Sequence, residues 1–212
     1  MGPFALRQSW PFCWWVGVVV DHFSRAVVGF AIFRGHPTSS DVQRFLDRAI
    51  RRAGCSPRYI ITDKGRQFWC YSYKRWCRRR TIRPRFGAVG RQGSIAIVER
   101  FIRSMKTECT RHILIPLQMR AMRCEIDAYA MWYNEHRPSQ ALGGRTPREV
   151  YSSLRPANAG RRFEPRRCWP TTGPCAFPQT AIRGERGVKL SLVVGHIDGK
   201  RHLPVVELRK AA

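Results

Sequence analysis

The sequence predicts an α/β fold, a mixed sheet flanked by helices, followed by a small carboxyl-terminal β unit. Two β-branched, apolar runs at 11–20 and 27–33 enclose a polar turn, which is the pattern of a hairpin. A shorter β-branched run at 59–62 ends in Asp63 and indicates a buried strand. Apolar residues at 98–109 recur at i, i+3, i+4, i+7 and i+11, the spacing of a helix with one buried face.

The amino-terminal apolar segment is expected to be part of a hairpin rather than a signal peptide or a membrane span. Residues 11–20 follow Arg7 as the apolar core of a signal peptide would, but no small-residue cleavage site accompanies them. Ten residues are also too few to cross a bilayer. Asp21 closes the run, and its expected role is to bond the turn amides around Ser24. Residues 1–10 contain no acid and are expected to form an irregular amino terminus.

Two helices are expected on either side of the strand at 59–62. The segment 40–43 matches a capping box, and the apolar residues after it keep helical spacing until Gly54 ends the helix. The second helix is expected at 67–80. The residues expected to pack inward from this second helix are Phe68, Tyr71 and Trp76.

The chain carries a large positive charge, +25 at pH 7, from 39 Lys and Arg against 14 Asp and Glu. Such an excess indicates a polyanion as partner, although charge alone does not separate DNA from RNA or from an anionic membrane surface. Seven of the cations fall between 74 and 85, on the second helix and a short strand expected near Ile82. A charge run of this kind is either a solvated face or a phosphate contact.

The remaining part of the core is expected to be helical. The segment 86–94 contains three glycines and few apolar residues, which predicts a loop before the helix that follows. A further amphipathic helix is expected between Pro116 and Pro138. Thr146 and Pro147 are expected as the N-cap and first position of a short helix. The stripe expected to be buried on the helix after Pro116 is Met122, Ile126, Tyr129 and Tyr133.

The composition changes after the core domain, which is expected to cover 11–154. Pro and Arg dominate 155–180 without a clear period, which indicates an extended basic linker. Residues 181–212 are expected to form a small β hairpin that turns at 198–199. This unit is either an independent domain or a hairpin packed back on the core.

Eight cysteines are scattered through the expected core elements, and none shows the paired spacing of a zinc site. Disulfides persist mainly in oxidising compartments. We therefore interpret these cysteines as reduced thiols, which predicts a cytoplasmic protein.

Two acidic residues, Asp63 and Glu99, are the candidate catalytic and metal-binding groups. Thirty-five residues lie between them, and Asp63 is expected at the carboxyl end of a strand, where open α/β sheets place their sites. If the two carboxylates converge, they can hold Mg²⁺ or Mn²⁺, because these cations prefer oxygen ligands. The alternative is a solvated helix face, on which Glu99 makes a weak ion pair with Arg103 or Lys106.

Several short motifs occur in a fixed order along the chain. They are Asp63 with Gly65 and Phe68, Glu99 and Arg100 with Lys106 and Glu108, the run 133–138 (YNEHRP), and the pair 146–147. In this order they resemble the DDE recombinases, that is, retroviral integrases and bacterial insertion-sequence transposases with an integrase core. The resemblance covers roughly residues 12–150.

The resemblance implies a ribonuclease H-like mixed sheet whose first strand lies between the second and the fourth. It also implies that Asp63 and Glu99 bind Mg²⁺ or Mn²⁺ in a two-metal site. The implied partner is DNA, as mobile-element ends and target, bound by a homo-oligomer, and no membrane is involved. The DNA contacts expected on this basis are Lys64, Arg91, Gln92, Arg100, Arg103 and Lys106.

The chain departs from the family at its beginning. The family's first catalytic Asp lies on the strand before the one that ends at Asp21, and residues 1–10 offer no acid there. We therefore expect the first strand to be imperfect or missing and the metal site to be incomplete. This interpretation makes the chain a truncated copy, or one whose start codon is placed too late in a longer reading frame.

Three functions remain open from the sequence. The first is a transposase or integrase that nicks and joins DNA by metal-dependent phosphoryl transfer. The second is a noncatalytic nucleic-acid-binding remnant of a transposase, inactive because the first Asp is not found. The third is an unrelated basic RNA-binding protein, for which substitution of Asp63 or Glu99 would have no effect.

Overall fold

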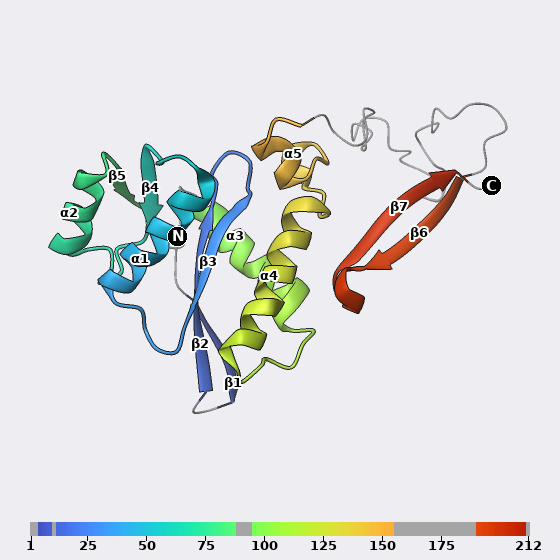
Figure 1. Cartoon of the computed structure of the whole chain (residues 1–212), viewed down its shortest axis with the longest axis horizontal. Helices are drawn as coiled ribbons and strands as arrows, with labels where there is room; N and C mark the ends of the chain where they lie inside the picture. Colours follow the sequence, from blue (N-terminus) through green and yellow to red (C-terminus); the bar gives the residue numbers. More distant parts are fainter. Residues whose placement is uncertain (1–3, 10–11, 88–94, 155–189, 211–212) are drawn as a thin grey trace, which may run out of the picture.

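The computed structural model describes four stretches of the chain (Figure 1). The expected linker at 155–180 lies outside them, as do Arg91 and Gln92. No helix in the described part combines the length and the apolarity that a membrane span needs. The described stretches are 4–9, 12–87, 95–154 and 190–210.

An antiparallel sheet in the order β1-β2-β3 contains the expected hairpin and one more strand. The hairpin is formed by β2 (Phe12–Val20) and β3 (Val27–Phe33). On the other edge of β2 lies β1 (Phe4–Ser9), with Phe4 opposite Val16. The expectation of an irregular amino terminus is therefore wrong for these six residues. They take the place expected for the first strand beside the second, where they supply hydrogen bonds that an open strand edge would lack.

A separate pair of parallel strands follows. It consists of β4 (Tyr59–Thr62) and β5 (Arg83–Phe86), with Tyr59 opposite Arg83. Among the described residues this pair forms a sheet of its own, and the three antiparallel strands form another. The short strand expected near Ile82 is confirmed as β5.

The helix α1 (Ser39–Ala53) is confirmed, but its expected start at 40–43 is too late. Thr38 is the N-cap: its hydroxyl accepts a hydrogen bond from the Asp41 N–H at 3.2 Å. In return, the Asp41 carboxylate accepts one from the Thr38 N–H at 2.9 Å. This reciprocal pair satisfies two backbone donors of the first turn. Gly54 ends the helix in the left-handed conformation, with φ of 72°.

The helix α2 (Tyr71–Arg79) begins later than expected. Phe68 is fully buried, but it belongs to the turn that precedes the helix. Tyr71, expected inside, is 70% exposed, and Tyr73 is fully buried in its place beside Trp76. The prediction for Tyr71 is wrong because the later start rotates the helix, so that a different set of side chains faces the core.

Apolar side chains pack on both faces of β2 and β3. Figure 1 shows α1 and α2 on one side of these strands, with α3 (Ala96–Met105) and α4 (Met119–Glu135) on the other. A π-helical turn at Lys106–Thr110, which the sequence did not predict, continues α3. The short helix α5 (Pro147–Tyr151) confirms Thr146 as its N-cap. The expected buried stripes are confirmed at Val98, Phe101, Met105, Cys109, Met122, Ile126, Tyr129 and Tyr133, none more than 8% exposed. Ile102, the i+4 member of the first stripe, is only partly buried.

The carboxyl-terminal hairpin consists of β6 (Leu190–His196) and β7 (Pro204–Lys210). His196 pairs with Pro204, so the connection is longer than the two-residue turn that the sequence predicts. It begins with a short helical turn at Ile197–Gly199. The tight-turn prediction is wrong because Ile197 is drawn into the core, at 9% exposure, and the chain needs extra length to bury it.

The hairpin contacts α4 through its connection. The Trp132 indole N–H donates to the Pro204 carbonyl at 2.7 Å. Lys200 and Glu125 form an ion pair at 2.6 Å. Leu203 is fully buried in the same cluster as the α4 stripe. Of the two arrangements left open by the sequence, these contacts match a hairpin packed back on the core.

Candidate active site

Asp63 directly follows β4, at the carboxyl end of the strand. Its Oδ1 accepts a hydrogen bond from the Gly65 N–H at 3.0 Å, which orients the half-buried carboxylate against the turn. A Cβ added to Gly65 would lie 2.6 Å from Gln67 Nε2 and 3.0 Å from Asp63 Oδ1. An added Cβ would therefore displace the amide group of the buried Gln67 side chain and crowd the Asp63 carboxylate.

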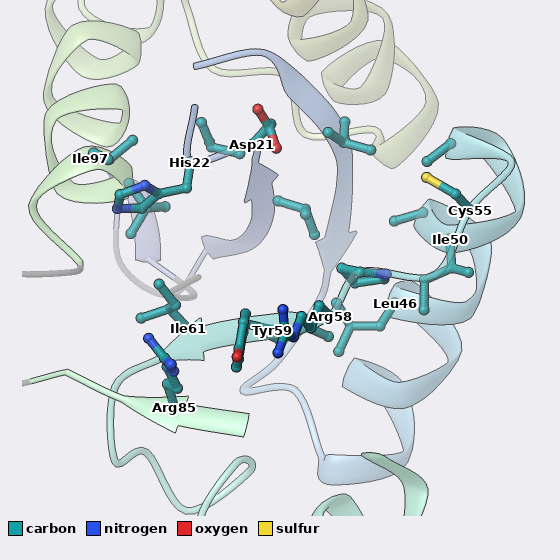
Figure 2. Close-up of a pocket in the computed structure, with 18 of the residues that line it drawn as sticks. Asp21, His22, Leu46, Ile50, Cys55, Arg58, Tyr59, Ile61, Arg85 and Ile97 are labelled. Carbon is teal, nitrogen blue, oxygen red and sulfur yellow. The ribbon is translucent and has the colours of Figure 1, made fainter. Parts of the chain in front are cut away.

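Glu99 lies in the first turn of α3 and is half-buried. A carboxylate in this turn is stabilised by the partial positive charge of the helix amino terminus. The neighbouring residues Ile97 and Val98 line a cavity that Ile61 of β4 also lines (Figure 2). β4 and the first turn of α3 thus border the same cavity, although neither Asp63 nor Glu99 is among the described residues that line it.

The donor chemistry in this region fits a hard divalent cation. Asp63 and Glu99 offer carboxylate oxygens, and Mg²⁺ commonly takes one or two carboxylates while keeping several waters. Thr62, which precedes Asp63, is fully buried, and its hydroxyl has no hydrogen-bond partner among the described residues. This hydroxyl supplies one more oxygen atom in the region. Within the described part, no group of three or more His, Cys, Asp or Glu could hold a metal ion.

The candidate DNA contacts that the structure describes are cationic groups near the two acids in sequence. Lys64, Arg100 and Arg103 are exposed, as contact with a phosphate backbone requires. Lys106 is half-buried in the π-helical turn. These side chains flank the turn after β4 and follow the outer side of α3.

Several cations lie against aromatic rings on segments before and after Asp63 in the sequence, and the sequence did not predict these contacts. Trp69 is 50% exposed, with Lys74 Nζ 3.9 Å and Lys64 Nζ 5.6 Å from its ring centroid. The Arg85 guanidinium lies 4.0 Å from the Tyr59 ring centroid. Cation–π contacts hold these charges at the surface. The mixture of aromatic and basic residues was visible in the sequence, but which side chains meet was not.

Glu108 and Arg137, both in motifs of the sequence, form a half-buried ion pair. The Arg137 Nε donates to both carboxylate oxygens, at 2.9 and 3.1 Å, and its Nη2 donates to Oε1 at 2.6 Å. The Tyr129 hydroxyl donates to the same carboxylate at 3.0 Å. Burial and the Glu108 charge raise the pKa of Tyr129, so its hydroxyl stays protonated as a donor. This arrangement joins the end of α3 to the end of α4.

Asn134, in the motif 133–138, and Asp21, at the end of β2, have structural roles. The Asn134 side chain accepts from the Val27 N–H at 2.9 Å and donates to the Val27 carbonyl at 3.0 Å, which fixes α4 to β3. Asp21 Oδ2 accepts from the N–H groups of Phe23 and Ser24 and from the Ser24 hydroxyl, at 3.2, 2.8 and 2.7 Å. The predicted role of Asp21 in the turn is therefore confirmed.

Comparison with protein families identifies the class. Two models of the integrase core domain match the chain, one over residues 7–92 and the other over residues 80–147. Both candidate carboxylates fall within the matched region. The chain belongs to the integrase core family of DDE integrases and transposases, as its motifs predicted.

Two bacterial relatives are similar to part of the chain. It is 32% identical over 145 residues to a Shigella flexneri protein named "Probable transposase for insertion sequence element IS1353", a match covering 64% of this chain and 26% of that protein. It is 30% identical over 137 residues to "Insertion element IS407 uncharacterized 31.7 kDa protein" of Burkholderia multivorans, covering 65% of this chain and 48% of that protein. The match therefore spans less than half the length of either relative.

The fold is similar to that of retroviral integrase cores. The HTLV-2 integrase catalytic core domain, solved with magnesium in a dimeric form, superposes with a TM-score of 0.56. The match covers 71% of this chain and 92% of that chain at 19% identity, so it shows the fold alone. The predicted ribonuclease H-like α/β fold is confirmed.

Proposed function

We propose that this chain carries out the DNA chemistry of a transposase, with Asp63 and Glu99 as the metal ligands of its active site. The observation that supports this most directly is that β4 and the first turn of α3 border one cavity. Two further observations support the proposal: the chain matches the integrase core family, and the carboxylates on these two segments are half-buried. The reaction is phosphoryl transfer that nicks and joins DNA at mobile-element ends and a target.

The residues around the two acids have defined tasks in this proposal. The Gly65 N–H orients the Asp63 carboxylate, and the first turn of α3 positions Glu99. Mg²⁺ or Mn²⁺ held between the two acids would stabilise charge on the attacking and leaving oxygens. The magnesium named with the HTLV-2 integrase core supports this choice of ion.

DNA is the proposed partner because the chain is strongly basic and its cations lie beside the two acids. Lys64, Arg100, Arg103 and Lys106 are the proposed phosphate contacts among the described residues. Arg91 and Gln92, outside the described residues, remain proposed contacts to the target. The net charge of +25 predicts binding that weakens steeply with salt, because each phosphate contact releases counterions. The dimeric form of the HTLV-2 core supports a homo-oligomer as the working unit.

A second candidate function is DNA binding without catalysis. It is favoured by one observation, that the described residues contain no group of three or more His, Cys, Asp or Glu that could hold a metal ion. An incomplete ligand set would bind metal weakly while leaving the phosphate contacts intact.

The experiment that separates the two functions measures end nicking and strand transfer on labelled duplex DNA with Mn²⁺. Wild type is compared with Asp63→Asn, Glu99→Gln and a control, Glu135→Gln, which changes an exposed acid on α4. The proposed catalytic function predicts activity in wild type and control that both site variants abolish. Salt-dependent DNA binding without activity in any of the proteins would favour the second function.

A further inference from the structure

The outer face of α2 carries cations and an exposed aromatic ring, and the helix contains no acid. Its inward side chains are at most 4% exposed, so the opposite face is fixed in the core. Three of the outer side chains are exposed and Lys74 is half-buried. The outer residues follow the i, i+3, i+4, i+7 spacing of one helix face, and they are Tyr71, Lys74, Arg75 and Arg78.

Trp69, two residues before α2, adjoins this face, because Lys74 Nζ lies 3.9 Å from its ring centroid. The ring is 50% exposed, and an edge-to-face contact with Phe86, with 4.8 Å between the ring centroids, holds its orientation. Lys64 Nζ lies 5.6 Å from the same centroid. Trp69 therefore has two cations within cation–π distance and half of its surface open to a ligand.

Tyr71 repeats this arrangement at the start of α2. Its ring is 70% exposed, and the Arg78 guanidinium carbon lies 5.8 Å from the ring centroid. Each of the two exposed rings thus has a cation beside it. The α2 surface is defined by these two rings and the cations of the helix face, that is, by Trp69, Tyr71, Lys74, Arg75 and Arg78.

The positive charge of this region is not neutralised by acids of the chain. Residues 64–98 contain ten Lys and Arg and no Asp or Glu. Within the described part of the chain, Arg80 pairs with Asp47 at 2.7 Å, whereas the cations of the α2 surface have no acid partner. These cations are therefore available to an anionic ligand.

Single-stranded nucleic acid matches both features of the α2 surface. Its unpaired bases stack on exposed aromatic rings, while its phosphates contact the Lys and Arg side chains nearby. Bases inside a duplex are covered by their neighbours, so side-chain rings on a protein surface do not stack on them. An anionic membrane is a poorer match, because a helix binds there by inserting its apolar face. The apolar face of α2 is buried in the core.

We propose that the α2 surface binds a single-stranded segment of DNA, with unpaired bases stacked on Trp69 and Tyr71 and phosphates held by the three cations. The choice of DNA rests on the proposed function, whereas the surface itself uses neither Asp63 nor Glu99. Binding of this kind tolerates any base sequence, because every base has a face that can stack.

The test measures the fluorescence anisotropy of fluorescein-labelled strands with the whole chain in EDTA, which removes the divalent metal that the proposed reaction needs. One strand is an oligothymidylate of about 15 nucleotides, and the other is an abasic strand with the same number of phosphates. Wild type is expected to bind the oligothymidylate at least about fivefold more tightly, because the abasic strand has no base to stack.

Variants of the two rings locate the binding. Trp69→Ala and Tyr71→Ala are each expected to weaken oligothymidylate binding at least about fivefold and to leave abasic-strand binding unchanged. Trp69→Phe keeps a ring and should retain most of the affinity. The matched control is Phe23→Ala, which removes a ring that is 78% exposed on the β2–β3 turn and should bind as wild type does. Circular dichroism checks the fold; if Trp69→Ala does not fold, Tyr71→Ala decides.

A pair of charge variants separates stacking from phosphate contact. Arg75→Gln combined with Arg78→Gln is expected to weaken binding of both strands and to reduce the slope of log affinity against log salt concentration, because phosphate contacts are lost. Arg120→Gln combined with Arg123→Gln removes the same charge from exposed positions of α4 and should have a smaller effect on both.

Four results would overturn the proposal. Equal binding of the two strands by wild type would show that no base stacks on the protein. Unchanged oligothymidylate binding by both ring variants would place the binding elsewhere on the chain. Tighter binding of oligouridylate than of oligothymidylate would replace DNA by RNA. Binding to phosphatidylserine vesicles that Tyr71→Ala weakens, with oligothymidylate binding unchanged, would make the surface a membrane contact.

Failure of the proposed function has a different readout. It is the absence of nicking and strand transfer with Mn²⁺, which the binding assay in EDTA does not measure.

Discussion

The ion pair between Glu108 and Arg137 gives a quantitative prediction about what joins α3 to α4. Both side chains are 28% exposed, so the pair lies between the surface class, worth about 0–1 kcal/mol, and the buried class, where breaking a pair costs about 3–5 kcal/mol. Its bidentate geometry favours a value above the surface range. We expect Arg137→Gln or Glu108→Gln to destabilise the protein by about 2 kcal/mol. At this chain length, that lowers the melting temperature by about 4–8 °C.

A double-mutant cycle isolates the interaction itself. Urea denaturation of wild type, both single variants and the double variant is expected to give a coupling energy of about 1–2 kcal/mol. The matched control is the pair Glu135 and Arg148, at 3.8 Å with side chains 44% and 52% exposed, for which coupling below about 0.5 kcal/mol is expected. Equal coupling in the two pairs would refute the claim that Glu108 and Arg137 join the two helices.

Three further predictions concern a helix cap, a buried thiol and the turn after β4. Thr38→Ala removes the N-cap of α1 and is expected to cost about 1 kcal/mol in urea denaturation. Hydrogen bonds from Thr38 lower the pKa of Asp41 from 3.8 to about 2. The stability that Asp41 contributes is therefore present above pH 3.8 and lost between pH 3.8 and about 2. The Thr38→Ala variant should lose less stability than wild type over this pH range. Burial raises the pKa of Cys109 to about 12, so at pH 8 iodoacetamide should modify exposed Cys124 and spare Cys109, as read by peptide mass spectrometry. Gly65→Ala should lower stability by about 1–3 kcal/mol, because its Cβ would meet the buried Gln67 side chain.

Each of these three predictions has a control experiment. Ser40→Ala changes an exposed residue of the first turn of α1 and should leave the acid limb of the stability curve unchanged. Protein unfolded in urea should react at Cys109 as readily as at Cys124. Gly35→Ala should be neutral, because nothing lies within 4 Å of the added Cβ. The cap prediction would be contradicted by a plot of stability against pH for Thr38→Ala that runs parallel to that of wild type. Early alkylation of Cys109 would contradict the thiol prediction. Equal stability of the two glycine variants would contradict the prediction for the turn.

Long periodic segments were predictable from sequence because their signal repeats over several turns. The buried stripes of α3 and α4 were predicted correctly, as was the β2–β3 hairpin with Asp21 at its turn. In these elements one pattern of apolar residues decides which face is buried. The motif 133–138 was also recognised in sequence, but its physical basis required the structure. Asn134 and Arg137 act on residues more than twenty-five positions away, which no local pattern reveals.

Predictions for short elements were wrong where a local cap or a tertiary contact determines where the element begins or ends. The start of α1 was placed too late because the pair Thr38 and Asp41 competes with the segment 40–43 as the cap. The inward face of α2 was wrong at Tyr71 because the start of a nine-residue helix sets its rotation. β1 was missed because its pairing partner is needed to define it. In the candidate site, the positions of Asp63 and Glu99 on their elements were foreseen, whereas the cations stacked on Trp69 were not.

The measurement that tests the central claim most directly is a titration with Mn²⁺. The electron paramagnetic resonance signal of the free ion reports how much Mn²⁺ the protein binds. If Asp63 and Glu99 hold one metal site, Asp63→Asn and Glu99→Gln should each weaken binding at least about tenfold. The double variant should bind little more weakly than either single variant, and Glu135→Gln should bind as wild type does. Unchanged Mn²⁺ binding in either single site variant would contradict a shared site.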